Sequence, residues 1–163
     1  MIKTANTIMV AMMILAASQA WGGDLADYDE LNGNNRAGIY QIGNEHTASI
    51  YQRGELNASG IEQHGNSNYA ALEQTGSQNL ATIEQMGFGN YSNVEQHGFN
   101  NNVDITQSGQ SNRVNAYQAG SQNDIEVSQA GSNNFVGIEQ HGSMLTSQVY
   151  QQGHNQHALI VQN

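Results

Sequence analysis

Three copies of the tetrapeptide Glu-Gln-His-Gly, which begin at Glu62, Glu95 and Glu139, are the first residues that suggest chemistry. A histidine beside a carboxylate can hold a metal ion or relay a proton. The side-chain amides suggest a second kind of chemistry, because one glutamine returns every eleven residues from Gln41 onward. Amides that stack above one another can donate and accept hydrogen bonds along a column. Which of these chemistries operates depends on the elements that hold the side chains.

From residue 32 onward the chain repeats one eleven-residue unit, most clearly at Gly76 to Met86. The frame is Gln-x-Gly-x-x-Asn-x-h-x-h-x-Gln, where h is a small or branched apolar residue, and it identifies a repeat protein. The repeated glutamines are Gln41, Gln52, Gln63, Gln74, Gln85, Gln96, Gln107, Gln118, Gln129, Gln140, Gln151 and Gln162. The glycines that we expect in the turns are Gly43, Gly54, Gly65, Gly76, Gly87, Gly98, Gly109, Gly120, Gly131, Gly142 and Gly153.

The pattern inside the unit distinguishes a strand from a helix. An eleven-residue period also suits a right-handed coiled coil. However, Asn79, Ala81, Ile83 and Gln85 recur at every second residue, which places them on one face of a strand and scatters them around a helix. A glycine in each unit would also cost a helix about 1 kcal/mol. We therefore expect a strand of about six residues followed by a glycine-containing turn.

A single strand cannot bury its apolar face, so we expect two strands to face each other in each coil. Twelve units then give an all-β solenoid of about six two-strand coils with parallel, in-register cross-β stacking. Equivalent residues lie one coil apart, about 4.8 Å. The predicted apolar core consists of Ile39, Ile50, Ile61, Leu72, Ile83, Val94, Ile105, Ala116, Val127, Ile138, Val149 and Ile160.

The same stacking solves the problem of the inward amides. A buried amide without a partner costs about 1 to 3 kcal/mol, but a glutamine lying over another glutamine can donate to its carbonyl oxygen. We expect continuous ladders of this kind from the twelve glutamines. A second set of ladders is expected from Asn35, Asn57, Asn68, Asn79, Asn90, Asn101, Asn112, Asn123 and Asn134.

The coil spacing argues against a metal site. His97 and His141 would lie two coils apart, about 10 Å, whereas a metal ion binds its ligands at about 2 Å. The chain also lacks the Gly-Gly-x-Gly-x-Asp repeat that binds calcium. Since no loop is longer than a turn, no cleft for a nucleophile is expected. We therefore expect no catalytic residue, no metal, no cofactor and no enzymatic activity.

The residues before the repeats predict export. Residues 1–20 contain an early lysine, the apolar run from Ile8 to Ala17 and small residues at a cleavage site, which is typical of a secretory signal peptide. The apolar run is too short to span a bilayer. We expect an acidic leader at 21–31, as a candidate secretion-targeting segment, and the repeat core at 32–163. The net charge of −10 argues against nucleic acid and anionic membranes as partners.

From Gln74 to Gln85 the chain resembles the curlin repeat almost letter for letter, and the resemblance extends over residues 32–163. It implies a secreted subunit of curli, the functional amyloid fibres of biofilms, which support surface adhesion and aggregation. Further implications are a partner curlin subunit and export through the periplasm and the outer-membrane curli channel, with its accessory proteins, to a cell-surface fibre. The leader would correspond to the family's channel-targeting segment, although it is shorter and poorer in glycine.

The last unit, Gly153 to Gln162, keeps the frame and contains no Lys or Arg. This favours the major fibre-forming subunit, although the even spacing is also typical of the minor subunit that nucleates fibres at the cell surface. A monomeric β-solenoid binding module is a second alternative. Monomeric solenoids carry capping elements because open edge strands recruit other chains. The frame shows no cap, so we expect copies of the chain to add end to end.

Overall fold

The computed structural model describes residues 7–10, 22–24 and 34–163. Twelve strands follow one another from residue 36, each of nine residues except the last, which has six. Most of the predicted signal peptide and leader lies outside the described residues. The strands are β3 (Arg36–Asn44), β4 (Thr47–Glu55), β5 (Ala58–Asn66), β6 (Tyr69–Ser77), β7 (Leu80–Phe88), β8 (Tyr91–Phe99), β9 (Asn102–Gln110), β10 (Arg113–Ser121), β11 (Asp124–Ser132), β12 (Phe135–Ser143), β13 (Thr146–His154) and β14 (His157–Gln162).

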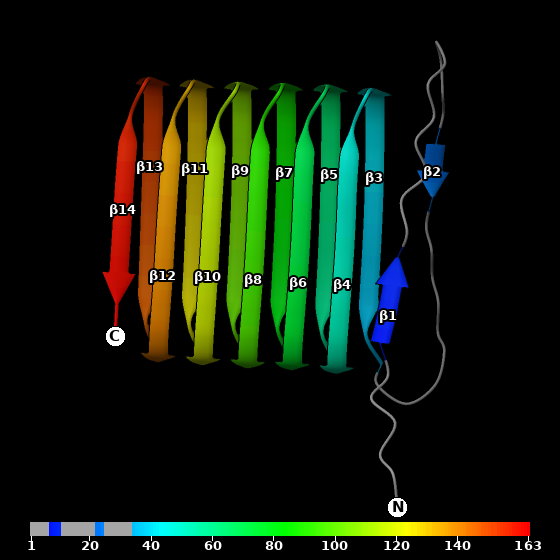
Figure 1. Cartoon of the computed structure of the whole chain (residues 1–163), viewed down its shortest axis with the longest axis vertical. Coiled ribbons are helices and arrows are strands. Elements are labelled where there is room, and N and C mark those ends of the chain that lie inside the picture. The colour runs from blue at the N-terminus through cyan, green and yellow to red at the C-terminus, as the bar shows by residue number, and fades with distance from the viewer. Residues whose placement is uncertain (1–6, 11–21, 25–33) are drawn as a thin grey trace, which may run out of the picture.

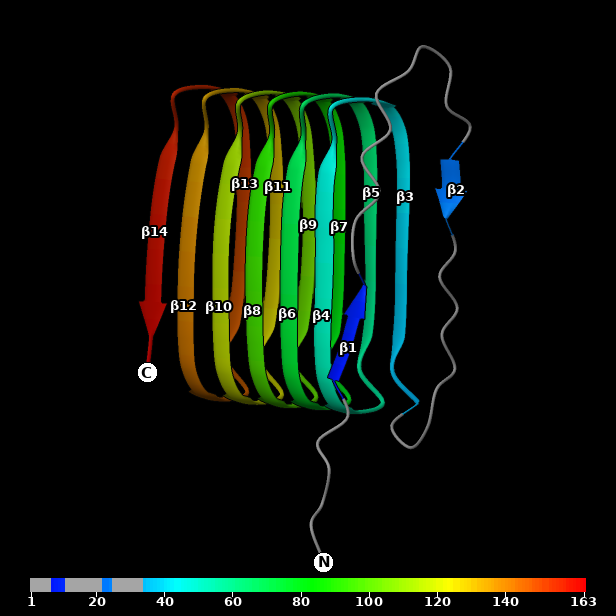
Figure 2. The ribbon, with the colours of Figure 1, turned by 45° about the vertical axis from the view of Figure 1, so that its right-hand side comes forward.

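The strands wind into a solenoid of two facing sheets (Figures 1 and 2). Sheet A contains the even-numbered strands β4 to β14, and sheet B contains the odd-numbered strands β3 to β13. Within each sheet, neighbouring repeat strands are parallel and pair in register with the strand twenty-two residues later, as Gln85 with Gln107. The structure therefore confirms the all-β solenoid of six coils with parallel in-register stacking.

Two short strands near the N-terminus pair in the opposite direction. β1 (Thr7–Val10) lies antiparallel to β4 in sheet A, and β2 (Gly22–Asp24) lies antiparallel to β3 in sheet B. They cover the outer edge of the first coil, whereas β13 and β14 at the other end pair with one neighbour each. Within the described residues, no helix has the length and apolar character needed to cross a bilayer.

The alternation predicted from the sequence is visible in each strand. In β7, the side chains of Ala81, Ile83 and Gln85 are buried between the sheets, and those of Thr82 and Glu84 face solvent. Successive side chains of a strand point to opposite faces. A period of two in the sequence therefore becomes one interior face and one exterior face.

The core is built from two apolar columns in each sheet. The predicted column is buried from Ile50 to Val149, while Ile39 and Ile160 in the end coils are partly buried. A second column lies two residues earlier in each unit. Its buried apolar members are Ala48, Ala70, Ala81, Val103, Val114, Ile125 and Val136. Each buried Ile or Val contributes roughly 1.5 to 3 kcal/mol before conformational entropy is subtracted.

The corners between strands are shorter than expected, because the strands are nine residues long rather than about six. Each corner has two residues, such as Gln78 and Asn79. The first adopts a left-handed conformation, with φ of 59° at Gln78, and is usually not glycine. The asparagine that follows donates from its side chain to nearby backbone carbonyls, as Asn79 Nδ2 does to the oxygen of Gly98 at 3.1 Å. These bonds close the corner.

The repeated glycines therefore lie near the ends of the strands rather than in the corners. Gly98 has a φ of 125°, and a Cβ placed on it would lie 1.9 Å from the carbonyl oxygen of Gly120 in the next coil. Similar overlaps, of 1.7 to 2.1 Å, occur at the equivalent glycines from Gly43 to Gly131. The glycines are required because the backbones of successive coils approach too closely for any side chain.

We predict that Gly98→Ala strongly destabilises the coil, since it combines a backbone clash with a φ that costs an L-residue about 1 to 3 kcal/mol by itself. The unfolding free energy of freshly purified monomer, measured with denaturant, should fall by about 2 kcal/mol or more. Gly60→Ala is the matched control, because a Cβ there meets no atom within 4 Å. Equal stabilities of the two variants would contradict this account of the glycines.

Candidate functional site

The interior glutamines form two unbroken ladders of hydrogen bonds. In sheet A, the Nε2 of each glutamine donates to the Oε1 of the next, at 2.7 to 3.0 Å, from Gln52 to Gln162. In sheet B, the same bonds run from Gln41 to Gln151 at 2.6 to 2.9 Å. All links in both ladders have the same direction, with the donor in the earlier coil. The ladders predicted from the sequence are therefore present.

Each glutamine also joins the two sheets. From Gln52 onward, its Nε2 donates to a backbone carbonyl sixteen residues earlier, as Gln96 does to the oxygen of Leu80 at 3.0 Å. Gln85 Nε2 additionally reaches the hydroxyl of Ser92 at 3.2 Å on the facing sheet. One amide group thus bonds along the stack and across it. This double use holds the sheets at a fixed separation and register.

The buried amides are almost completely satisfied. The glutamines from Gln52 to Gln140 are 0 to 1 % exposed, which would be costly without partners. Within the described residues, the single buried side-chain oxygen or nitrogen without a hydrogen-bond partner is Oε1 of Gln52, the first acceptor of the sheet A ladder.

The asparagine ladders lie at the corners, just before each strand begins. The Oδ1 of one asparagine accepts from the backbone N–H twenty-two residues later, as Asn79 Oδ1 does from Asn101 at 3.1 Å. The end coils depart from this pattern. His46 takes the asparagine position in the first coil and accepts from the N–H of Asn68 through Nδ1 at 3.3 Å. In the last coil, Leu145 and Gln156 occupy the asparagine position.

The predicted core and ladders omitted three sets of interior residues, namely the second apolar column, Ser92 and His46. The second apolar column and the buried serine Ser92 occupy a position that the frame already marked as small or branched. His46 was missed because a histidine does not resemble an asparagine in a pattern. The common signal is the register, since each of these residues lies at a position of the eleven-residue unit that the frame marks.

The exterior of sheet A carries aromatic contacts along the stack. The rings of Tyr69 and Tyr91 are stacked with centroids 4.8 Å apart, and the guanidinium of Arg113 lies 4.7 Å from the Tyr91 centroid. His97 and His141 are separated by the ring of Tyr117, at 5.6 and 5.2 Å. Within the part of the chain that the structure describes, no group of three His, Cys, Asp or Glu residues is arranged to hold a metal.

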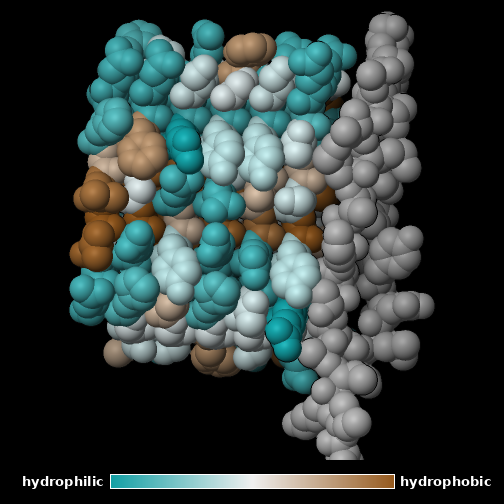
Figure 3. Space-filling model, viewed as in Figure 1, coloured by the Kyte–Doolittle hydropathy of each residue, from teal (hydrophilic) through white to brown (hydrophobic). Residues whose placement is uncertain are grey.

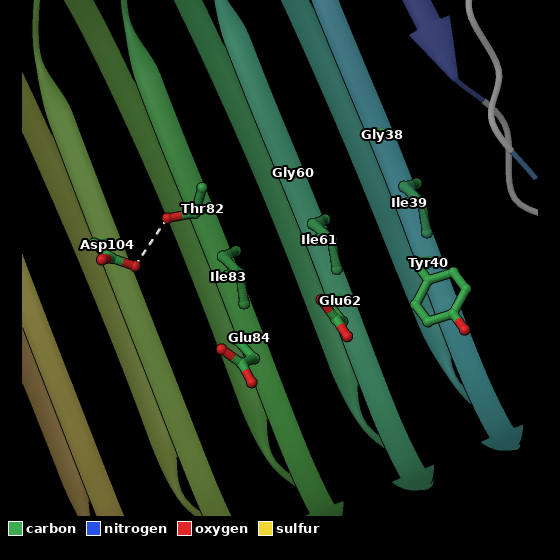
Figure 4. Close-up of a pocket in the computed structure, with 10 residues that line it drawn as sticks. All are labelled: Gly38, Ile39, Tyr40, Gly60, Ile61, Glu62, Thr82, Ile83, Glu84 and Asp104. Carbon is green, nitrogen blue, oxygen red and sulfur yellow. Dashed lines mark hydrogen bonds between the residues drawn. The ribbon is translucent and has the colours of Figure 1, made fainter. Parts of the chain in front are cut away.

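The exterior of sheet B contains a shallow hollow of about 400 Å³ (Figure 4). It forms because Gly38 and Gly60 contribute no side chain to this face. Its polar rim includes Glu62, Glu84 and Asp104, of which Asp104 accepts a hydrogen bond from Thr82 at 2.8 Å. The hollow lies on the flat face of a sheet, and its lining contains Thr and carboxylates but no histidine.

A hydrogen-bonded brace joins the last two strands of sheet B. The carboxylate of Glu126 accepts from Tyr150 at 2.6 Å and from Gln148 at 2.5 Å. The hydrogen bond from Tyr150, followed by that from Gln148, lowers the pKa of Glu126 below its ordinary value. The same hydrogen bond raises the pKa of Tyr150. The brace fixes β13, the open edge strand, onto β11.

Comparison with known protein families decides the classification. Four segments match the family described as the Curlin associated repeat, at residues 47–76, 60–87, 76–109 and 109–142. Together they cover more than half of the chain. The chain belongs to the curlin repeat family. No curated protein and no solved structure matches the chain. The curlin repeats are structural units, and the repeated frame of this chain corresponds to the ladders, the core columns and the close-packed glycines.

We predict that Gln96→Leu in a central curlin repeat destabilises the fold. It leaves the Nε2 of Gln74 without its acceptor and the Oε1 of Gln118 without its donor. With about 1 to 3 kcal/mol for each unsatisfied buried group, the unfolding free energy should fall by about 2 to 6 kcal/mol. Gln110→Leu, at an exposed glutamine, is the control and should change it by about 0.5 kcal/mol or less. An equally mild effect at Gln96 would show that the ladder contributes little.

The brace predicts a pH dependence. Because the pKa of Glu126 is lowered on folding, its stabilising contribution is present above the unfolded pKa and is lost as the pH falls through the folded pKa. When the pH falls below about 4.5, the unfolding free energy of Glu126→Gln should therefore decrease less than that of the parent. Glu139→Gln, at an exposed carboxylate, is the control. Denaturant unfolding between neutral and acid pH measures both, and identical acid profiles for Glu126→Gln and the parent would contradict the prediction.

Proposed function

We propose that this chain is a secreted structural subunit that adds end to end into curli amyloid fibres of the biofilm matrix, where it supports surface adhesion and aggregation. The observation that carries the proposal is the geometry of the coils. Each coil already pairs with the next by parallel, in-register strands and amide ladders. This is the arrangement by which separate chains stack in cross-β fibres. Contacts between copies would repeat contacts within one copy.

The open edge at the C-terminal end supports this proposal. β13 and β14 present unpaired backbone groups on their outer sides, and such edges recruit other strands. The most exposed large apolar side chains lie near this end as well, with Leu159 74 % and Val161 56 % exposed. Figure 3 shows hydrophobic surface at the β14 edge of sheet A, at the left of the view, and in a narrow band across the middle of this face. A second copy of the chain would cover both features.

The route of the subunit follows from its N-terminal residues and its family. Residues 1–20 act as the signal peptide, residues 21–31 direct the chain to the outer-membrane curli channel and its accessory proteins, and residues 32–163 form the fibre core. The fibre lies at the cell surface, together with a partner curlin subunit. The major-subunit role is favoured because the last repeat continues sheet A in register, with β14 paired to β12 from His157 to Gln162.

We expect the secreted chain to form fibres without any other protein and Ile160→Pro to block their growth. Proline removes the backbone N–H of residue 160, which faces β12 in the parallel register, and fixes φ. The edge strand β14 is then held less well in place for an incoming chain, so elongation should slow roughly tenfold or more while the other coils still fold. Ile160→Ala keeps the N–H and is the control. Thioflavin fluorescence measures growth, and fibre diffraction should show spacings of about 4.8 and 10 Å. Failure of the parent chain to form such fibres would refute the proposed function.

A further inference from the structure

The hollow on the exterior of sheet B runs along the stack from one coil to the next. Its floor is the backbone of β3 and β5 at Gly38 and Gly60, which pair with each other and leave two successive positions without a side chain. Thr82 occupies the same position in β7 and closes one end. Within the part of the chain that the structure describes, a Cβ at either glycine would meet no atom within 4 Å. The space above the two glycines is therefore free to receive a ligand.

The long wall of the hollow combines an aromatic ring with carboxylates. Tyr40, Glu62 and Glu84 occupy one column of the register on β3, β5 and β7. Tyr40 is 45 % exposed. Asp104, which pairs with Thr82, adds a third carboxylate at the closed end. Figure 4 shows these side chains along the same face of the sheet.

The carboxylates of the wall are not neutralised by basic partners of this chain. The Nε2 of His64 lies 2.5 Å from Oε1 of Glu62, and Thr82 donates to Asp104 at 2.8 Å. Within the described residues, no hydrogen bond or ion pair reaches the carboxylate of Glu84. The wall therefore presents negative charge to whatever enters the hollow.

The surrounding face has the same sign of charge. On the described exterior of sheet B, Arg36 is the one Lys or Arg side chain. The carboxylates on this face are Glu62, Glu84, Asp104, Asp124 and Glu126. A field of one sign around a concave, mostly apolar surface attracts a ligand of the opposite charge. Charge complementarity thus selects a cation.

The repeat of the solenoid selects the kind of cation. Equivalent positions of successive coils lie about 4.8 Å apart, so the carboxylates of Glu62 and Glu84 recur at about this interval. In an aliphatic polyamine, short runs of methylene groups separate the ammonium groups by a similar distance. Such a chain sets its ammonium groups against the wall while its methylene groups lie over Gly38 and Gly60. A metal ion matches the charge alone, and no cage of ligands for one exists within the described residues.

We infer that the hollow is a binding site for a linear aliphatic polyamine such as spermidine. The inference does not depend on fibre assembly, because every group of the hollow belongs to one copy of the chain. A bound polyamine also offsets the repulsion between Glu62 and Glu84. Since the ligand contacts successive strands of sheet B and binds only the folded chain, it stabilises the N-terminal coils.

Equilibrium dialysis of the folded chain against spermidine tests the inference, whether or not the chain is assembled. We expect saturable binding of one spermidine per chain, with a dissociation constant of about 1 mM or below at low ionic strength. The affinity should fall as salt rises above about 0.15 M, because the carboxylates are exposed. Magnesium at the same concentration should displace the spermidine poorly.

Two variants separate the shape of the hollow from its charge. Gly60→Leu fills the hollow and keeps every carboxylate, so the affinity should fall roughly tenfold or more. Circular dichroism checks that this variant keeps its β structure. Glu84→Gln keeps the shape and removes one charge, which should weaken binding roughly two- to fivefold.

Glu95→Gln is the matched control, because it makes the same change of charge on sheet A. Glu95 stacks on Glu73 as Glu84 stacks on Glu62, but Ala71 and Asn93 occupy the positions that the glycines leave open on sheet B. This variant should bind spermidine as the parent does. Equal affinities of Gly60→Leu and the parent, equal weakening by Glu84→Gln and Glu95→Gln, or binding that does not saturate would overturn the inference. If Gly60→Leu loses its β structure, the comparison of the two glutamine variants decides.

Discussion

The need of buried amides for hydrogen-bond partners governs the whole structure. A glutamine placed between two sheets is tolerated only when both its donor and its acceptor are used, and the ladder uses them by stacking each amide on its own kind. That solution requires equivalent residues to lie directly over one another. A shift of one residue along the strand would turn Gln85 outward and Met86 inward. The amides therefore fix the register that the apolar columns alone would leave less sharply defined.

The glycines and corner asparagines follow from that register. Direct stacking brings the backbones of successive coils together at the end of each strand, where Gly98 has no room for a side chain below Gly120. The next residues turn the chain, and Asn101 closes the corner by donating to the carbonyls of His97 and Gly120. Each repeated residue of the unit thus has a defined role in one geometry. The outward positions are free of this constraint and vary, from the Tyr69 and Tyr91 stack to the hollow beside Gly60.

A stack that satisfies its interior by repetition leaves its ends unsatisfied. The first coil keeps an open acceptor at Gln52, and the last coil keeps open donors and exposed apolar side chains around β14. In most folds the polar groups at the boundary are covered by water or caps. Here another copy of the chain carries the groups that would complete these ends. This connects the internal stacking to the proposed assembly of fibres.

The sequence by itself determined the repeat length, the strand character, the two-strand coil and the members of the ladders, because a period of two within a period of eleven leaves few alternatives. It also placed Ile83 and Gln85 on the buried face. The length of the strands and the position of the glycines were decided only by the tertiary structure. Gly87 takes part in the parallel pairing of β7 with β9. The local preference of glycine for turns would have placed it outside the strand. The same is true of His46 in the asparagine column and of the open oxygen of Gln52, since both depend on which residue lies one coil away rather than on neighbours in the chain.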